Sequence, residues 1–156
     1  MKRILVLLML LFASGLVQAG PPPAVQAVDP WIREAPPGMP MMAGFVTLKN
    51  RGSAPVALTS AEGPDFGQIE LHRSITENGV ARMVPQERIV IPPGAEIRLE
   101  PGSYHLMLMQ PRRALRAGDS ARILLHFDDG TTLALAFPVR SDRDGMSDMS
   151  GMHHHH

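Results

Sequence analysis

The sequence predicts an all-β fold, a single domain built as an antiparallel β-sandwich. Short apolar runs are separated at close intervals by Gly, Pro and Asn residues, as in proteins made of many short strands. Two of the separating segments contain Asn-Gly or Asp-Gly, dipeptides that favour tight β-hairpins. No stretch repeats apolar residues with a helical period over about ten positions. These patterns favour a sandwich or barrel without choosing among sandwich topologies.

The first nineteen residues are typical of a secretory signal peptide. Lys2 and Arg3 form a basic start, residues 4–12 are apolar, and residues 17–19 have the small-residue pattern of a cleavage site. The apolar run is shorter than the roughly 20 residues that span a bilayer, so we favour cleavage after Ala19 over a transmembrane anchor. No Cys follows the run, which argues against a lipid-anchored lipoprotein.

Removal of residues 1–19 leaves 137 residues, enough for one domain with its own core. The mature chain would carry 13 basic and 15 acidic residues, a net charge of −2, which gives no indication of a nucleic-acid partner. Because the sequence contains no Cys, it has no disulfides. Packing must therefore stabilise the fold, and any soft metal ligand must be Met.

The mature chain divides into a leader, a domain and a tail. Residues 20–27 are a Pro- and Ala-rich leader, residues 28–140 are the predicted β-sandwich domain, and residues 141–156 are a tail. A first strand contains Trp31 and Ile32 and ends before Pro36. Further strands are expected at residues 43–49, 56–60, 68–76, 80–85, 87–91, 96–99, 104–110, 121–127 and 131–139.

A cluster of Met39, Met41 and Met42 precedes the second predicted strand. These side chains could be thioether ligands or a soft entry route for a metal, but Met also packs well into irregular gaps of a core. We favour core packing because no His accompanies them in the sequence.

The Asn78-Gly79 hairpin brings a His and a Met together. A two-residue turn at this dipeptide pairs Ser74 with Met83, so His72 and Met83 become diagonal neighbours on one face. The second hairpin, at Asp129-Gly130, joins residues 121–127 to 131–139 and contains His126. A single His in an apolar strand is more often hydrogen-bonded structure than a metal ligand, so we give it a structural role.

The strand at residues 104–110 offers a second His and Met. Because side chains alternate along a strand, His105, Met107 and Met109 share one face. Thioether sulfur favours Cu(I), and imidazole accepts several transition metals, so two His and two Met predict a Cu(I) site. Structural zinc sites rarely use Met, and a blue-copper electron-transfer site would need a Cys.

The spacing of these residues resembles the copper-binding pattern of the PCu(A)C family of periplasmic copper chaperones. Ten residues separate His72 from Met83, twenty-one separate Met83 from His105, and one separates His105 from Met107. The resemblance extends from about Trp31 to Arg140, although Arg73 stands where many members have Met. Flanking segments that also match are Glu77-Asn78-Gly79-Val80, Ile91-Pro92-Pro93-Gly94, Gly102 and His105-Leu106-Met107-Leu108-Met109.

The resemblance implies a cupredoxin-like sandwich and a copper chaperone rather than an enzyme. It implies that Cu(I) is delivered to the Cu(A) centre of cytochrome c oxidase, in subunit II, alongside other periplasmic copper carriers. We expect a periplasmic monomer with no membrane span after signal cleavage. No Ser-His-Asp set, phosphate loop or paired carboxylates stand out. The alternatives are an interaction module without functional metal and an enzyme that uses copper for redox chemistry.

The tail is polar and rich in Met and His. Such a segment cannot bury enough apolar surface to fold alone, and its His-rich end is typical of metal binding. Because the signal peptide is present, we favour a native tail over a purification tag. We expect it to hold a second ion, with Cu(II) on imidazole and Cu(I) on sulfur. The candidate residues are Met146, Met149, Met152, His153, His154, His155 and His156.

Overall fold

A computed structural model describes residues 23–141, which contain ten β-strands and no helix. Accordingly, this part of the chain has no helix long and apolar enough to cross a membrane. The all-β fold class is confirmed. The strands are β1 (Val25–Arg33), β2 (Met41–Asn50), β3 (Val56–Glu62), β4 (Phe66–Glu77), β5 (Val80–Pro85), β6 (Ile89–Ile91), β7 (Glu96–Leu99), β8 (Tyr104–Pro111), β9 (Ser120–Phe127) and β10 (Thr132–Arg140).

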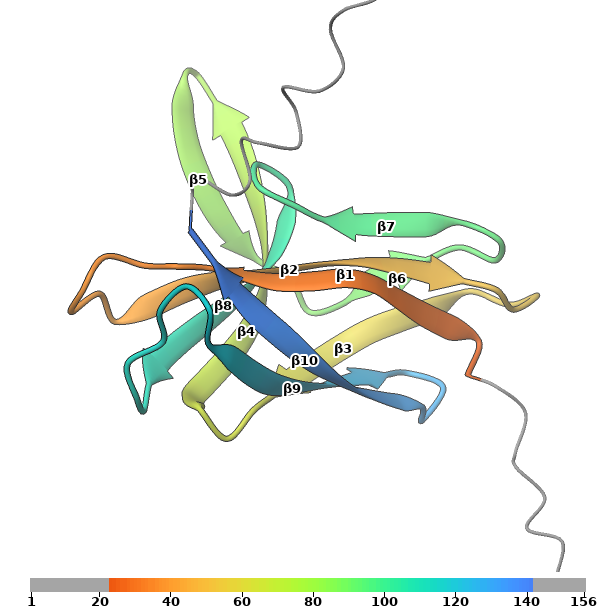
Figure 1. Cartoon of the computed structure of the whole chain (residues 1–156). Helices are drawn as coiled ribbons and strands as arrows, with labels where there is room; N and C mark the ends of the chain where they lie inside the picture. The colour runs from red at the N-terminus through yellow and green to blue at the C-terminus, as the bar shows by residue number, and fades with distance from the viewer. Residues whose placement is uncertain (1–22, 142–156) are drawn as a thin grey trace, which may run out of the picture.

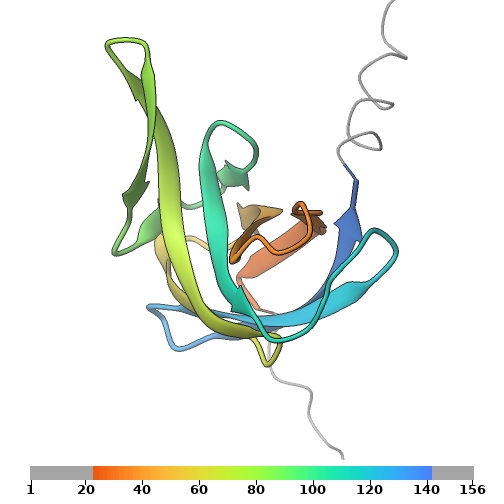
Figure 2. The same cartoon turned by 90° about the vertical axis from the view of Figure 1, so that its left-hand side faces the viewer.

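The strands form one curled sheet whose two halves face each other as a sandwich, with β5 and β6 at its edges (Figure 1). Their order is β5-β4-β8-β7-β2-β1-β10-β9-β3-β6, with a further pairing of β8 to β2. Figure 2 shows the β4–β8 part of the sheet and the β9–β10 part curving around a common interior. Two pairings, β1 with β10 and β7 with β8, are parallel, and the other strand pairs are antiparallel.

The core lies between the two layers and is built by strand alternation. On β8, Leu106 and Leu108 are fully buried and belong to the core, whereas His105, Met107 and Met109 point to the other side of the sheet. The alternation therefore separates the residues that hold the fold together from the candidate ligands. Other fully buried core side chains are Val25, Ile32, Leu48, Leu58, Ile89, Ile91, Ile123, Leu125 and Phe137.

The first strand begins at Val25, three residues before the expected start of the domain. Val25 is 1% exposed and pairs with Asn50 of β2, so residues 25–27 belong to the sandwich rather than to a leader. The Pro- and Ala-rich composition hid this strand, because the sequence shows no long-range pairing. The predicted signal peptide, residues 20–22 and almost all of the predicted tail lie outside the described residues.

Both predicted hairpins are confirmed. Asn78 and Gly79 have φ angles of 51° and 77°, as a two-residue turn with both central residues in the left-handed region requires. Glu77 pairs with Val80 and Ser74 with Met83, in the predicted register. All six residues of β5 are exposed, and the end of the β4–β5 hairpin projects beyond the sandwich (Figure 2).

Candidate metal site

The β4–β8 ladder brings the two candidate His residues together. His72 of β4 pairs directly with His105 of β8, and Glu70 pairs with Met107. Directly paired residues of neighbouring strands point to the same face, so both imidazoles, the carboxylate and the thioether share one side of the sheet. The ring centroids of His72 and His105 are 5.7 Å apart, with the ring planes at 51°. Segments 33 residues apart in the sequence thus place two imidazoles side by side.

Both imidazoles are buried, and each has one ring nitrogen hydrogen-bonded. His72 is 8% exposed and its Nε2 lies 2.8 Å from Oε2 of Glu70. His105 is 3% exposed and its Nδ1 lies 3.2 Å from the Ser103 carbonyl oxygen. A carboxylate and a carbonyl can only accept, so each of these nitrogens is the one that carries the proton in the neutral ring. The pairing thereby fixes the tautomer of each His.

The other ring nitrogens carry lone pairs and lack partners. Among the described residues, neither Nδ1 of His72 nor Nε2 of His105 has a hydrogen-bond partner, although both atoms are buried. An unpaired buried polar atom is costly, so it needs an explanation such as an ion that is bound in the working protein. Metal-binding His residues usually donate their second ring N–H to a carboxylate or carbonyl, as both do here. The two imidazoles therefore fit a metal ion.

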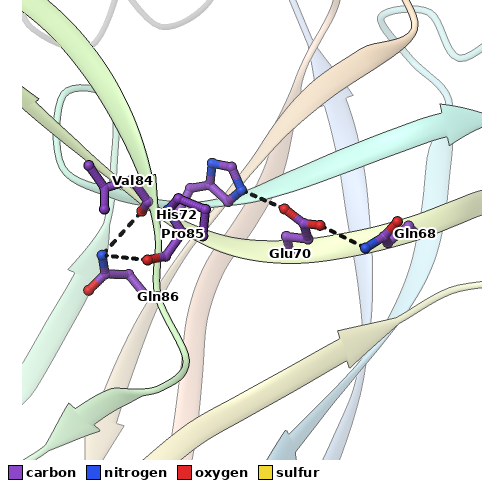
Figure 3. A network of polar contacts seen from close by, with 6 residues as sticks. All are labelled: Gln68, Glu70, His72, Val84, Pro85 and Gln86. Atoms are coloured by element: carbon purple, nitrogen blue, oxygen red, sulfur yellow. Dashed lines mark hydrogen bonds and ion pairs between the residues drawn. The ribbon is translucent and has the colours of Figure 1, made fainter.

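Glu70 links His72 to Gln68 in a short chain of hydrogen bonds. Its Oε2 accepts from His72, and its Oε1 accepts a 2.7 Å hydrogen bond from Nε2 of Gln68 (Figure 3). On the other side of His72, Gln86 donates from Nε2 to the carbonyls of Val84 and Pro85, at 3.1 Å each. The sequence patterns did not indicate a role for Glu70 at the site. Its position two residues before His72, on the same face of the strand, is the signal that could have done so.

Burial also keeps His105 neutral. Removal of the ring from water lowers the pKa of His105, and this effect outweighs the opposing influence of the Ser103 carbonyl. The neighbouring His72 ring lowers the pKa of His105 further. Since only a neutral imidazole offers a lone pair to a metal, this environment favours the binding form.

The two candidate Met residues differ strongly in exposure. Met107 is 7% exposed, whereas Met83 is 59% exposed. Both line a cavity of about 260 Å³ that His105 also lines. Within residues 23–141, no group of three or more His, Cys, Asp or Glu side chains could hold a metal ion. The soft side chains on the same face as the two imidazoles include the thioethers of Met83 and Met107.

The prediction that Met39, Met41 and Met42 fill the core is wrong for two of the three. Met42 is 6% exposed and belongs to the core, whereas Met39 and Met41 are 47% and 42% exposed; all three line the same cavity as His105. Alternation along β2 sends Met41 and Met42 to opposite faces. The sequence could not show that β8 brings a His to this cluster, because the β2–β8 pairing joins distant segments.

Arg73 and His126 both lie apart from the candidate ligands. Strand alternation puts Arg73 on the opposite face of β4 from His72, where its guanidinium carbon lies 5.2 Å from the ring centroid of Tyr104. His126 lies on β9, where its Nε2 is 3.1 Å from Oε1 of Glu62, in keeping with the structural role expected. The tail candidates, Met146, Met149, Met152 and the four terminal His, lie outside the described residues.

Sequence comparison places residues 25–139 in one family. These residues match the family described as "Putative lipoprotein LpqE-like". The "Putative lipoprotein Lxx21020" of Leifsonia xyli subsp. xyli is 34% identical over 117 residues, which cover 74% of this chain and 69% of the relative. A second relative, "Uncharacterized protein RP573" of Rickettsia prowazekii, is 32% identical over 123 residues, covering 76% of this chain and 68% of the relative.

Solved structures with the same fold are PCuAC domains and a related copper protein. The copper-bound PCuAC domain from PmoF2 has a TM-score of 0.66 at 18% identity, covering 76% of this chain and 94% of that one. The Cu(I)-bound DR1885 of Deinococcus radiodurans has a TM-score of 0.58 at 29% identity, covering 81% of this chain and 83% of that one. The chain therefore belongs to the LpqE-like family, and its resemblance to the PCu(A)C copper chaperones is confirmed.

Proposed function

We propose that this protein is a copper chaperone that binds Cu(I) through His72, Met83, His105 and Met107 and passes it to another protein. One observation carries the proposal: two buried imidazoles lie side by side, each with its N–H paired and its lone pair without a partner among the described residues. Thioethers lie on the same face, and sulfur of this kind selects Cu(I) over harder ions.

The donor set suits a carrier better than a permanent copper centre. All four donors are neutral, and the sequence has no Cys to supply a thiolate. Without a thiolate, the site holds the ion less firmly than a cysteine site would, which favours release to an acceptor. The exposure of Met83 places one donor where an acceptor can reach it. The cargo keeps its oxidation state, so this function needs no catalytic residue.

The proposed compartment rests on the N-terminal signal pattern and the relatives, and the proposed acceptor rests on the resemblance to the PCu(A)C family. The family and one relative are described as lipoproteins, which supports a secreted or envelope protein, and the signal-peptide pattern supports export, for which we propose the periplasm. The 156 residues contain no Cys on which a lipid could be attached. The proposed acceptor is the Cu(A) centre of cytochrome c oxidase subunit II, or another periplasmic copper carrier.

The tail is proposed as a second copper site. Met146, Met149 and Met152 offer sulfur for Cu(I), and His153, His154, His155 and His156 offer nitrogen that suits Cu(II). A chain ending at Arg140 should keep the tight Cu(I) site and lose most of the Cu(II) binding. Full Cu(II) binding by the shortened chain would move that site into the domain.

The test of the domain site is a Cu(I) titration against a competing chelator. The wild-type chain should bind one Cu(I) tightly at the domain, and the double variant Met83→Ala, Met107→Ala should bind it far more weakly. Unchanged affinity in the double variant would refute the Met ligands. A chain that remains metal-free after exposure to copper would instead be an interaction module.

A further inference from the structure

Three exposed thioethers gather around the cavity that His105 and Met107 line. Met39, Met41 and Met83 are 47%, 42% and 59% exposed, and all three line this cavity of about 260 Å³. They come from two separate segments: Met39 and Met41 from the stretch that leads into β2, and Met83 from β5. Single exposed apolar residues are ordinary, but three Met side chains around one opening form a group with a common chemistry.

The strand register places the exposed Met41 and Met83 next to the buried candidate donors. Ala43 of β2 pairs with Met107, and Met41 pairs with Met109, so Met41 is diagonal to Met107 on the same face. From the other side, Met83 pairs with Ser74, two residues beyond His72 on β4. The small side chain of Ala43 stands between Met41 and Phe45 on this face and also lines the cavity. The exposed thioethers therefore line one space with His105 and Met107, and His72 is the direct strand partner of His105.

Backbone hydrogen bonds hold the segment that carries Met39 against the sheet. The Met39 amide donates to the Pro36 carbonyl at 3.2 Å, which closes a turn with Gly38 at a φ of 81°. The Gln110 amide of β8 donates to the Pro40 carbonyl at 2.8 Å. These bonds hold residues 36–40 beside β8, so Met39 is presented at the cavity by an anchored turn.

We propose that Met39, Met41 and Met83 form a second, outer Cu(I) site at the mouth of this cavity, through which copper enters and leaves the His72–His105 site. This inference rests on the proposed function. Three neutral sulfur donors suit Cu(I) and offer little to Mg²⁺, Ca²⁺ or Zn²⁺. Met83 belongs to both sets and therefore links the outer site to the inner one.

Transfer between the two sites is a ligand exchange. As copper moves inward, bonds to Nδ1 of His72, Nε2 of His105 and the Met107 sulfur form while those to the Met39 and Met41 sulfurs break, and release reverses the order. The copper remains Cu(I), no electron moves, and no proton is released because every donor is already neutral. The outer site lowers the barrier because the ion never loses all its donors at once.

The experiment follows the Met methyl groups of the full chain by NMR during a Cu(I) titration, with methyl-¹³C methionine. The first equivalent at the domain should shift the signals of Met83 and Met107 strongly. The signals of Met39 and Met41 should also shift, by less, as the same ion exchanges between the two sites, because Met83 serves both and they are not filled together. In parallel, Cu(I) transfer from the chain to a strong chelator is timed for wild type and for Met39→Leu, Met41→Leu. Leu keeps the approximate volume and removes the sulfur.

The double Leu variant should keep its equilibrium affinity for the first Cu(I) within about twofold. Its transfer to the chelator should slow about tenfold, the effect of a barrier raised by about 1.4 kcal/mol. The matched control is Met109→Leu, because Met109 lies on the same face of β8 but does not line the cavity. Its transfer rate should equal that of wild type.

The outcomes separate this inference from the proposed function. If Met83 and Met107 shift but Met39 and Met41 do not, and the double variant transfers copper at the wild-type rate, the outer site is refuted while the inner site stands. If none of the four signals moves on addition of Cu(I), the copper site itself is refuted. A slowed transfer in Met109→Leu equal to that in the double variant would also overturn the outer site.

Discussion

The β4–β8 ladder and the β5 edge differ in how they hold their candidate donors. On the ladder, His72 and His105 are buried on strands that are paired on both sides, with their N–H groups bound to Glu70 and to the Ser103 carbonyl. On the edge strand, Met83 is largely exposed and every other residue of β5 is exposed as well. Well-paired central strands open rarely, while edges with few buried contacts move more readily. The ladder is thus suited to retain copper, and the edge to exchange it.

Removal of the ladder imidazoles should have the largest effect. We expect His72→Ala, His105→Ala to lose more than 100-fold in Cu(I) affinity, beyond the roughly 10–100-fold typical of changes to residues that only support a ligand. A chelator competition measures the loss. The control is His126→Ala, because His126 of β9 is bound to Glu62 of β3 and lies outside the proposed site. The Cu(I) affinity of this variant should equal that of wild type. A double variant that retains wild-type affinity would show that the ladder does not hold the ion.

Glu70→Gln should have the next largest effect, although Glu70 is not proposed as a ligand. The carboxylate orients His72 through the 2.8 Å bond to Nε2 and fixes its tautomer, which leaves the lone pair on Nδ1. We expect a loss of roughly 10–100-fold in Cu(I) affinity. Glu96→Gln is a matched control, because Glu96 is a carboxylate on β7 that pairs with Arg98 and Lys49. Equal affinities of the two variants would contradict the role of Glu70.

The pH dependence should distinguish the buried His105 from an exposed one. An ordinary His titrates near pH ~6.5, but burial lowers the pKa of His105 in the folded chain. Between these two pKa values the unfolded chain binds a proton that the folded chain does not. The free energy of unfolding of the copper-free protein should therefore decrease as the pH falls from about 6.5 through the folded pKa of His105.

Chemical denaturation at several pH values measures this trend, and His105→Asn should weaken it. For the same reason, proton competition at His105 should reduce Cu(I) retention at a lower pH than it would at an exposed His. Stability that increases as the pH falls from about 6.5, and does so only when His105 is present, would contradict the assignment.

Met83→Leu should have the smallest effect on the fold. The side chain is 59% exposed, so the free energy of unfolding should change by less than about 0.5 kcal/mol. The affinity for Cu(I) should nevertheless fall, because a thioether is lost. Thermal denaturation and chelator competition on the same sample separate the two effects. An unfolding energy that falls by about 2 kcal/mol or more would mean that β5 is part of the stable framework.

The sequence was informative where the determinants are local. Asn78-Gly79 specified the turn and therefore the pairing of Ser74 with Met83, and alternation along β8 separated Leu106 and Leu108 from His105 and Met107. It was less informative where distant segments pair. The direct pairing of His72 with His105, the diagonal approach of Met41 to Met107, and the burial of Val25 against Asn50 each depend on strands that are far apart in the chain.

The role of Glu70 lay between these cases, since its shared face with His72 is local but its hydrogen bond depends on the rotamers of both side chains. The parallel pairing of β1 with β10 had no sequence signal, because it joins the two ends of the domain.

The most direct test of the account is ¹⁵N NMR of the histidine ring nitrogens in the full chain, with and without one equivalent of Cu(I). The geometry predicts that the ion binds opposite nitrogens of the two rings. Nδ1 of His72 and Nε2 of His105 should shift strongly, while Nε2 of His72 and Nδ1 of His105 keep their protons. Copper bound to the domain with both lone-pair nitrogens unshifted, or bound through the nitrogens that face Glu70 and Ser103, would contradict it.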